Sequence, residues 1–272
     1  MPPAAATALH RATTAEIVAR LETELAASSG VAGALLASDA DGTIWDGDVG
    51  IDLFEAVLAS RGAREAAREA LAAEARSIGL AAEGDANALA AALYEAYKID
   101  RYPHDRAFAM MAWVFAGHHR DELGALCERV LREGRLEARI RPELRAIFAW
   151  AASRGVEVYV VSASARAMVE LAVRHLGIAA DHVAAMTPAL SADGVLLPEL
   201  DGPIVYGEGK LAALERARGG ASLASTALLG AFGDSVYDAA MLRAARLPVA
   251  VTPTPGLVAL GPTIAGLVVL DR

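Results

Sequence analysis

The chain has 272 residues, with 34 acidic against 25 basic side chains and a formal net charge of -9. This charge repels phosphate polymers and no lysine- or arginine-rich block offsets it, so nucleic-acid binding is not expected. Hydrophobic residues make up 55% of the chain but aromatic residues only 5%, and much of the apolar content is alanine. This composition favours close-packed helices over a β-sandwich.

The cysteine and hydropathy patterns are typical of a protein of the reducing cytoplasm. Cys127 is the only cysteine, so no intrachain disulfide or multi-cysteine metal site can form, and a buried apolar role is expected for it. Residues 1–27 contain no continuous apolar segment, and no apolar run elsewhere is long enough to span a bilayer. We therefore expect a soluble, cytoplasmic protein with no membrane partner, whose oligomeric state the sequence does not indicate.

The first predicted element is a helix. Thr13 stands three residues before Glu16, the spacing of a capping box, and apolar residues then recur at helical intervals as far as Leu25. Residues 31–38 follow as an unbroken small and apolar run, which predicts a strand buried on both faces.

Strands and helices alternate again in the second half of the chain. Further strands are predicted at 156–163, 226–233, 247–252 and 267–270, with helices near 165–176, 208–218 and 236–245. The segment 190–202 has an Asp-Gly turn between apolar runs and predicts a β-hairpin. The alternation predicts an α/β fold with a doubly wound, mainly parallel, Rossmann-like sheet.

This alternation is absent between about residues 50 and 140, where Ala/Glu/Arg-rich stretches show helical spacing. We interpret 50–140 as an inserted all-helical cap domain. The catalytic core would then comprise 1–49, with residues 1–30 as an N-terminal helical extension, and 141–272. The insertion leaves the sheet after the first strand and returns with a predicted helix at 141–154, so both of its ends are expected near the first strand's carboxyl edge, where open α/β sheets bind ligands.

The first predicted strand ends in the sequence Asp39-Ala40-Asp41-Gly42-Thr43. Side chains alternate along an extended chain, so Asp39 and Asp41 are expected on the same side, close enough to share a ligand. Because two such carboxylates repel each other, this pair indicates either a bound divalent cation or an acid-base function.

Chemically active side chains also follow the other strands. Ser162 ends the strand 156–163, Asp234 and Asp238 follow the strand 226–233, and Lys210 opens a helix after a tight turn. Each has a structural alternative, because Ser162 and Asp234 are also common helix caps and Lys210 is typical of a solvated surface. Taken together at one edge of a sheet, they indicate a joint site.

The order Asp-x-Asp-Gly-Thr, Ser, Lys, Gly-Asp-Ser-x-x-Asp resembles the haloacid dehalogenase superfamily. Within it, the chain is similar to the phosphoserine-phosphatase-like branch, which carries a helical cap after the first motif. The resemblance covers roughly residues 31–270. It implies a haloacid-dehalogenase-type α/β core and a phosphoric monoester hydrolase acting on a small phosphorylated metabolite.

The resemblance also implies roles for the motif residues. Asp39 would be the nucleophile that forms an aspartyl-phosphate, and Asp41 would protonate the leaving alkoxide and then deprotonate the hydrolytic water. Mg²⁺ would be held by Asp39, the backbone carbonyl of Asp41 and Asp234, with Asp238 as a further or supporting ligand.

Further residues would bind the phosphoryl group or the rest of the substrate. Ser162 would donate to a phosphoryl oxygen, and Lys210 would neutralise charge and keep Asp39 ionised. The residues assigned to substrate binding are Gly42 and Thr43 in the first turn, Ala163 and Ser164 beside Ser162, and Arg101 and Arg106 in the cap.

Several alternatives stay open at this point. Asp46 and Asp48 could meet a substrate ammonium group or form a turn, Arg166 could reach the substrate or be exposed, and Trp45 could line the pocket or pack beneath the cap. His118 and His119 lack the spacing of a zinc site and are expected to be exposed.

Other activities would use the same motifs. A phosphotransferase or mutase differs only in the acceptor of the phosphoryl group, whereas a non-catalytic phosphate-binding protein is expected to lose one of the charged residues. Hydrolytic dehalogenation is the weaker interpretation, because halide leaves without the proton that Asp41 would supply.

Overall fold

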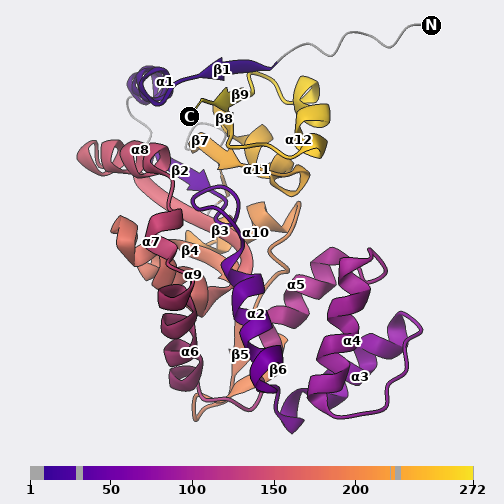
Figure 1. Cartoon of the computed structure of the whole chain (residues 1–272). Helices are drawn as coiled ribbons and strands as arrows, with labels where there is room; N and C mark the ends of the chain where they lie inside the picture. The colour runs from indigo at the N-terminus through magenta and orange to yellow at the C-terminus, as the bar shows by residue number, and fades with distance from the viewer. Residues whose placement is uncertain (1–8, 29–32, 221, 224–227, 272) are drawn as a thin grey trace, which may run out of the picture. The chain divides into compact units, whose positions relative to one another are not determined.

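The computed structural model describes residues 9–28, 33–220, 222–223 and 228–271. It contains two compact units (Figure 1). Unit 1 comprises residues 1–47, 139–161 and 206–272, and unit 2 comprises residues 48–138 and 162–205. The predicted cap of residues 50–140 therefore falls almost wholly in unit 2, which also includes a later segment of the chain. Its existence as a separate cap domain stays a prediction.

A seven-stranded sheet is the main β-structure. Its order is β1-β9-β8-β7-β2-β3-β4, and the pairs from β1 to β3 are all parallel. In that order the strands are His10–Ala12, Val268–Leu270, Leu247–Ala250, Leu228–Gly233, Leu35–Ser38, Glu157–Ala165 and Val183–Met186. The predicted α/β class with a doubly wound sheet is confirmed.

Two strands were not predicted from the sequence. Strand β1 contains the charged pair His10-Arg11, and β4 is the short Val183–Met186 segment with two alanines. Neither has the long apolar or alternating pattern that identifies a strand. Strand β3 was predicted but runs two residues further, to Ala165, and helix α9 begins at Arg166, close to the predicted start near residue 165.

Strand β2 is buried at all four positions, as its apolar sequence predicts. Its neighbour β7 carries Gly230 opposite Leu36. A Cβ atom at Gly230 would lie 2.9 Å from the Leu21 side chain and 3.2 Å from that of Leu36. Glycine is therefore needed for helix α1 to pack closely on these strands.

Unit 1 places helices beside its strands (Figure 1). Both α1 and α11 contact β7 and β8, and α1 also contacts α8. The predicted capping box of Thr13 and Glu16 is present at the start of α1. The Trp150 indole donates to Glu22 at 2.7 Å, which joins α8 to α1. The helices of unit 1 are α1 Thr14–Ala27, α8 Pro142–Ser153, α10 Gly209–Ala217, α11 Ala239–Ala244 and α12 Pro255–Leu260, with short 3-10 helices η4 Val236–Asp238 and η5 Gly261–Thr263.

Unit 2 is mostly helical. Its inserted segment holds α2 Val49–Ser60, η1 Glu65–Ala67, α3 Arg68–Ser77, α4 Ala86–Lys98, α5 His104–Trp113, α6 Arg120–Glu133 and α7 Leu136–Arg139, whose last residue belongs to unit 1. Its second segment adds α9 Arg166–Val173, η2 Arg174–Leu176, η3 Ala180–His182 and an antiparallel hairpin of β5 Pro188–Leu190 and β6 Leu196–Leu200.

This hairpin confirms the prediction for residues 190–202. It also explains why the two segments of unit 2 form one compact body. The backbone N–H of Gly117 donates to the Leu196 carbonyl at 2.8 Å, and that of Arg120 donates to the Gly194 carbonyl at 2.9 Å. These bonds extend the hairpin along the loop before α6.

Among the described residues, no helix combines the length and the apolar character needed to cross a membrane. Cys127 is buried in α6, and burial raises the pKa of its thiol to about 12. Its predicted role as a small apolar side chain is confirmed.

Candidate active site

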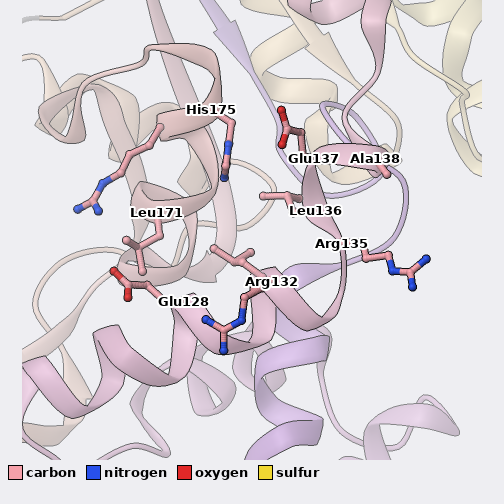
Figure 2. A pocket seen from close by; sticks show the side chains of 10 residues that line it. Glu128, Arg132, Arg135, Leu136, Glu137, Ala138, Leu171 and His175 are labelled. Atoms are coloured by element: carbon pink, nitrogen blue, oxygen red, sulfur yellow. The ribbon is translucent and has the colours of Figure 1, made fainter.

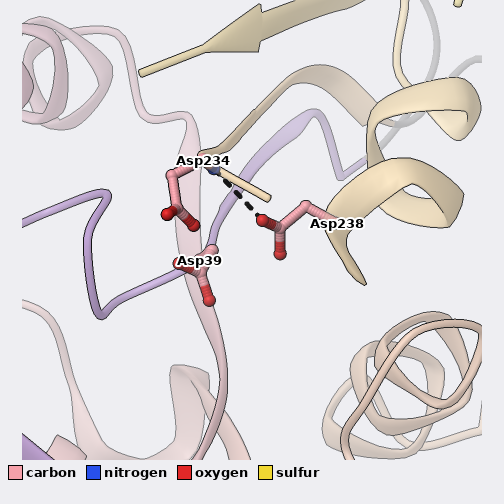
Figure 3. Close-up of side chains that lie close together, drawn as sticks. All are labelled: Asp39, Asp234 and Asp238. Atoms are coloured by element: carbon pink, nitrogen blue, oxygen red, sulfur yellow. Dashed lines mark hydrogen bonds between the residues drawn. The ribbon is translucent and has the colours of Figure 1, made fainter. Parts of the chain in front are cut away.

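Three aspartates meet at the ends of neighbouring strands in unit 1. Asp39 directly follows β2. Its backbone N–H donates to the carbonyl of Phe232 in β7 at 2.9 Å, so the hydrogen bonding between β2 and β7 extends to Asp39. Asp234 follows β7, and Asp238 ends the 3-10 helix η4. One carboxylate oxygen from each of the three lies within 4.8 Å of the others (Figure 3). We call these residues the aspartate cluster.

Lys210 joins this cluster from the start of α10. Its Nζ lies 2.7 Å from Asp39 Oδ1 and 2.5 Å from Asp238 Oδ1, and all three side chains are buried. Three carboxylates against one ammonium group leave two negative charges when all four groups are ionised. A buried surplus of this kind requires a further positive species or a proton.

The remaining oxygens of Asp39 and Asp238 also have donors. Asp39 Oδ2 accepts from the Thr43 hydroxyl at 2.9 Å. Asp238 Oδ2 accepts from the backbone N–H of Asp234 at 3.1 Å, and from the N–H and hydroxyl of Ser235 at 2.9 and 3.0 Å. These bonds hold Asp238 in place, so it organises the turn as well as contributing charge.

Asp234 differs from its two neighbours. No side chain that the structure describes donates a hydrogen bond to its half-buried carboxylate, and only its own backbone N–H lowers its pKa by hydrogen bonding. A half-buried carboxylate with so few donors lacks most of the partners that normally compensate for lost hydration. Asp234 is therefore the member of the cluster best suited to bind a cation directly.

Burial and mutual repulsion raise the pKa values of the cluster. Burial raises the pKa of Asp39 well above its ordinary value, Lys210 opposes that shift, and the charges of Asp238 and Asp234 add to it. Burial, followed by the charge of Asp238, raises the pKa of Asp234 to about 7. Burial alone would lower the pKa of Lys210, but the carboxylates of Asp238 and Asp39 outweigh it and raise that pKa.

The cluster fits a divalent cation on chemical grounds. Carboxylate oxygens are the ligands that Mg²⁺ prefers in proteins, the uncompensated charge equals that of one divalent ion, and no described side chain competes for the Asp234 carboxylate as a donor. A bound cation would lower the raised pKa values of these aspartates, because it favours their ionised carboxylates.

The turn after β2 lies close against the cluster. Gly42 has φ 79°, and a Cβ atom there would lie 2.7 Å from Asp234 Oδ2. Both the left-handed backbone and this close approach require glycine. The position of Asp234 thus gives Gly42 a structural reason to be glycine, and its predicted contact with substrate stays a prediction.

A buried arginine holds the turn from the opposite side. Arg141 donates through Nε to the Thr43 carbonyl at 3.1 Å and through Nη2 to the Gly42 carbonyl at 3.0 Å, and it pairs with Asp46 at 2.5 Å. The Thr252 hydroxyl also donates to the Gly42 carbonyl, at 3.3 Å. Sequence reasoning missed Arg141 and Thr252, because neither stands in a recognisable pattern and both are remote from the turn along the chain.

Asp41 contacts Trp45, a residue whose position the sequence did not determine. Trp45 is fully buried, and its indole N–H donates to Asp41 Oδ1 at 2.9 Å. Trp45 therefore packs inside unit 1, next to the predicted acid-base residue.

The structure also shows the contacts of the other side chains whose roles the sequence left open. Asp46 pairs with Arg141, and Asp48 caps helix α2 by accepting from the Ile51 N–H at 2.8 Å. Arg166 is paired with Glu170 inside unit 2 at 2.6 Å. His119 caps helix α6, and His118 contacts the Gly62 carbonyl at 2.8 Å through Nε2. These contacts give each side chain a structural role.

Ser162, Ala163 and Ser164 belong to unit 2, at the end of β3. The Ser162 hydroxyl accepts from the Ser164 N–H at 3.0 Å, and both serines are buried. A Cβ atom at Gly50 would lie 2.2 Å from Ser164 Oγ, so α2 approaches this serine closely. The predicted roles of these three residues in phosphate and substrate binding stay predictions.

The two cap arginines are engaged within unit 2. Arg101 donates to the carbonyls of Ile78 and Gly79 at 3.2 and 3.1 Å. Arg106 pairs with Glu74 and donates to the Ser77 hydroxyl. Both arginines therefore connect α3 to the α4–α5 region, and their predicted contact with substrate stays a prediction.

Unit 2 also has a cavity of about 760 Å³. Figure 2 shows its lining, which comes from α6, α7, α9 and η2 and includes Leu131, Leu136, Leu171 and His175. None of the lining residues is a predicted site residue, so sequence reasoning gave no indication of it.

The sequence matches the model of the haloacid dehalogenase-like hydrolase family over residues 36–243. The chain belongs to this family. The resemblance predicted from its four motifs is therefore confirmed, and the protein is a haloacid dehalogenase-like hydrolase. No curated protein matches it in sequence.

Solved structures show where the fold recurs. A protein of unknown function from Bordetella pertussis Tohama I is 22% identical, with a TM-score of 0.69 over 89% of this chain and 99% of the other. A functionally unknown protein from Anaerococcus prevotii is 14% identical, with a TM-score of 0.64 over 96% and 93%.

A substrate-bound phosphoserine phosphatase is 15% identical, with a TM-score of 0.52 over 89% of this chain and 94% of the other. At these identities the likeness concerns the fold alone. It agrees with the predicted α/β fold.

Proposed function

We propose that this hydrolase is a Mg²⁺-dependent phosphatase that cleaves a small-molecule phosphomonoester through an aspartyl-phosphate on Asp39. The observation that carries the proposal is the aspartate cluster with its single ammonium group, Lys210. A site that holds two uncompensated negative charges is suited to a divalent cation together with an anionic phosphoryl group.

Asp39 is the proposed nucleophile because both of its oxygens are held by donors. Lys210 Nζ contacts Oδ1 and the Thr43 hydroxyl contacts Oδ2, so the carboxylate is fixed in one orientation. In the first step a carboxylate oxygen of Asp39 forms a bond to phosphorus as the bond from phosphorus to the ester oxygen breaks. Lys210 favours the ionised nucleophile and offsets phosphoryl charge.

Asp41 is the proposed acid and base. Its carboxyl group gives a proton to the departing ester oxygen, which leaves as an alcohol. In the second step the Asp41 carboxylate removes a proton from water, whose oxygen attacks the phosphorus of the aspartyl-phosphate. The phosphorus–Asp39 bond breaks, and inorganic phosphate and the original enzyme are produced.

The cation would be held by Asp39 and Asp234, with the backbone carbonyl of Asp41, while Asp238 orients the turn. When bound, Mg²⁺ would offset the charges of the cluster and of the phosphoryl group. Ser162, with Ala163 and Ser164, is proposed to bind the phosphoryl group, and the helices of unit 2 are proposed to select the substrate and exclude water.

The test is a panel of phosphomonoesters with the full chain in Mg²⁺, including 4-nitrophenyl phosphate, phosphorylated amino acids, sugars, amino alcohols and nucleotides. Phosphate release is expected from at least one of them, and D39N should lose on the order of 10³-fold or more of the activity. Acid quenching should trap one phosphoryl group on the peptide that contains Asp39. If D39N retained near-normal activity, Asp39 would not be the nucleophile.

A further inference from the structure

The contact between Trp45 and Asp41 takes part in neither of the two proposed chemical steps. The indole Nε1 donates to Asp41 Oδ1 at 2.9 Å, and Trp45 is fully buried. We propose that Trp45 is a positioning residue that holds Asp41 in the orientation from which it transfers its proton to the leaving group. This inference rests on the proposed phosphatase function.

The segment that carries Trp45 is fixed from several sides. Trp45 forms β-bridges with Asp41 and Ile140. The Asp46 N–H donates to the Arg139 carbonyl at 3.1 Å, and the Arg141 N–H donates to the Ile44 carbonyl at 2.9 Å. The segment 139–141 therefore supports residues 44–46, and the indole has a defined position from which to direct the Asp41 side chain.

The chemistry of indole makes this contact directional. Indole N–H is a donor only, whereas a carboxyl group carries its proton on one oxygen and accepts best at the other. Donation to Oδ1 therefore directs that oxygen towards the indole. Trp45 thereby fixes how the two oxygens of Asp41 are oriented, and it restricts rotation of a side chain that is only partly buried.

If the Trp45–Asp41 contact were only structural, its loss would have a different effect on activity. A buried indole N–H needs an acceptor, and on that reading Asp41 only satisfies Trp45. Loss of the contact would then lower stability and affect all substrates equally. A positioning role instead predicts that the loss depends on how much the leaving group needs a proton.

The experiment compares 4-nitrophenyl phosphate with phenyl phosphate, which differ little in size but strongly in the basicity of the leaving phenolate. The variant W45F keeps an aromatic ring and removes the N–H donor. The matched control is W150F, because Trp150 also donates an indole N–H to a carboxylate, that of Glu22. The measured quantity is kcat/KM, which covers steps up to departure of the leaving group.

W45F should lower kcat/KM for phenyl phosphate about 10-fold or more and leave that for 4-nitrophenyl phosphate within about threefold, since general acids typically contribute 10²–10⁴-fold. W150F should change neither value by more than about twofold. D41A should show the same selective loss to a greater extent, and adding W45F to D41A should have no further effect.

Equal losses on the two substrates, no loss on phenyl phosphate, or a full additional loss in the double variant would overturn the positioning role. The proposed function fails in a separate way, namely if the unaltered protein releases phosphate from neither substrate or D39N stays active. In that case the inference falls with it.

Discussion

Each unit contains a cluster built around one basic side chain, and the two clusters differ in charge balance. In unit 1, Lys210 contacts Asp39 and Asp238, with Asp234 beside them. In unit 2, Arg106 pairs with Glu74 alone, and the Tyr102 hydroxyl donates to the same carboxylate at 2.7 Å.

The comparison shows what distinguishes a structural cluster from a candidate active site. The Arg106–Glu74 pair is balanced and joined by neutral donors, so it requires nothing further. The aspartate cluster has two surplus negative charges in a buried place, which is unfavourable until a cation or proton arrives. Imbalance of charge, and not burial alone, identifies the site that should bind a ligand.

The largest expected effect comes from removing each basic residue. K210M should lower kcat/KM on the order of 10²-fold or more, because a preorganised charge beside the nucleophile is lost. The matched variant R106M should leave kcat within about threefold, because Arg106 is not part of the aspartate cluster, whereas KM should rise if Arg106 contacts the substrate as predicted. Steady-state kinetics on the best substrate of the panel measures both.

Thermal unfolding of both variants in Mg²⁺ shows whether they are folded. A folded K210M protein with unchanged kinetics would contradict the role of Lys210. A selective rise in KM for R106M would support the predicted contact of Arg106 with substrate and would show that its pairing with Glu74 is not its main function.

Metal affinity should depend on Asp234. D234N should weaken Mg²⁺ binding at least about 10-fold, since even supporting groups of metal sites typically contribute that much, and E74Q in unit 2 should not change it. Isothermal titration calorimetry with the metal-free proteins measures this directly. Equal affinities of D234N and the unaltered protein would exclude Asp234 as a ligand.

The stability of the metal-free protein should decrease as pH rises. Burial and the charge of Asp238 raise the pKa of Asp234 from its ordinary 3.8 to about 7 in the folded state, so the folded protein binds the proton more tightly than the unfolded chain. The stabilising contribution is complete below pH 3.8 and is lost as pH rises towards 7.

Urea unfolding in a chelator at pH 5 and pH 8 tests this prediction. At pH 8, D234N should have an unfolding free energy about 1 kcal/mol or more above that of the unaltered protein, and Mg²⁺ should remove that advantage. An unfolding free energy that did not decrease from pH 5 to pH 8, with no difference between the two proteins, would contradict the raised pKa.

The smallest effect is expected from the balanced cluster. E74Q leaves Arg106 without its carboxylate, so the unfolding free energy should fall by about 1 kcal/mol, whereas kcat/KM should not change. Urea unfolding at pH 7 and kinetics measure the two quantities. A loss of activity in a stable E74Q protein would show that this cluster contributes to function after all.

The sequence by itself determined where five strands of the main sheet lie along the chain, the first helix with its capping box, the hairpin and the family. These features depend on local patterns, because burial on both faces of a strand, a capping box and an Asp-Gly turn all involve residues close together along the chain. The motif residues Asp39, Lys210, Asp234 and Asp238 could be singled out for the same reason, since each follows a strand or begins a helix.

Only the tertiary structure decided how those residues share their charges. Nothing near Asp234 in the sequence shows that no described side chain donates to its carboxylate. Nor does it show that Arg141 and Thr252 hold the turn at Gly42, because those contacts join segments about 100 residues or more apart. The Trp45–Asp41 contact spans only four residues, yet it too depends on the fold, since segment 139–141 supports the chain around Trp45. Hydrogen bonds and buried charges depend on distance in space, which one sequence records only where neighbours in space are also neighbours in the chain.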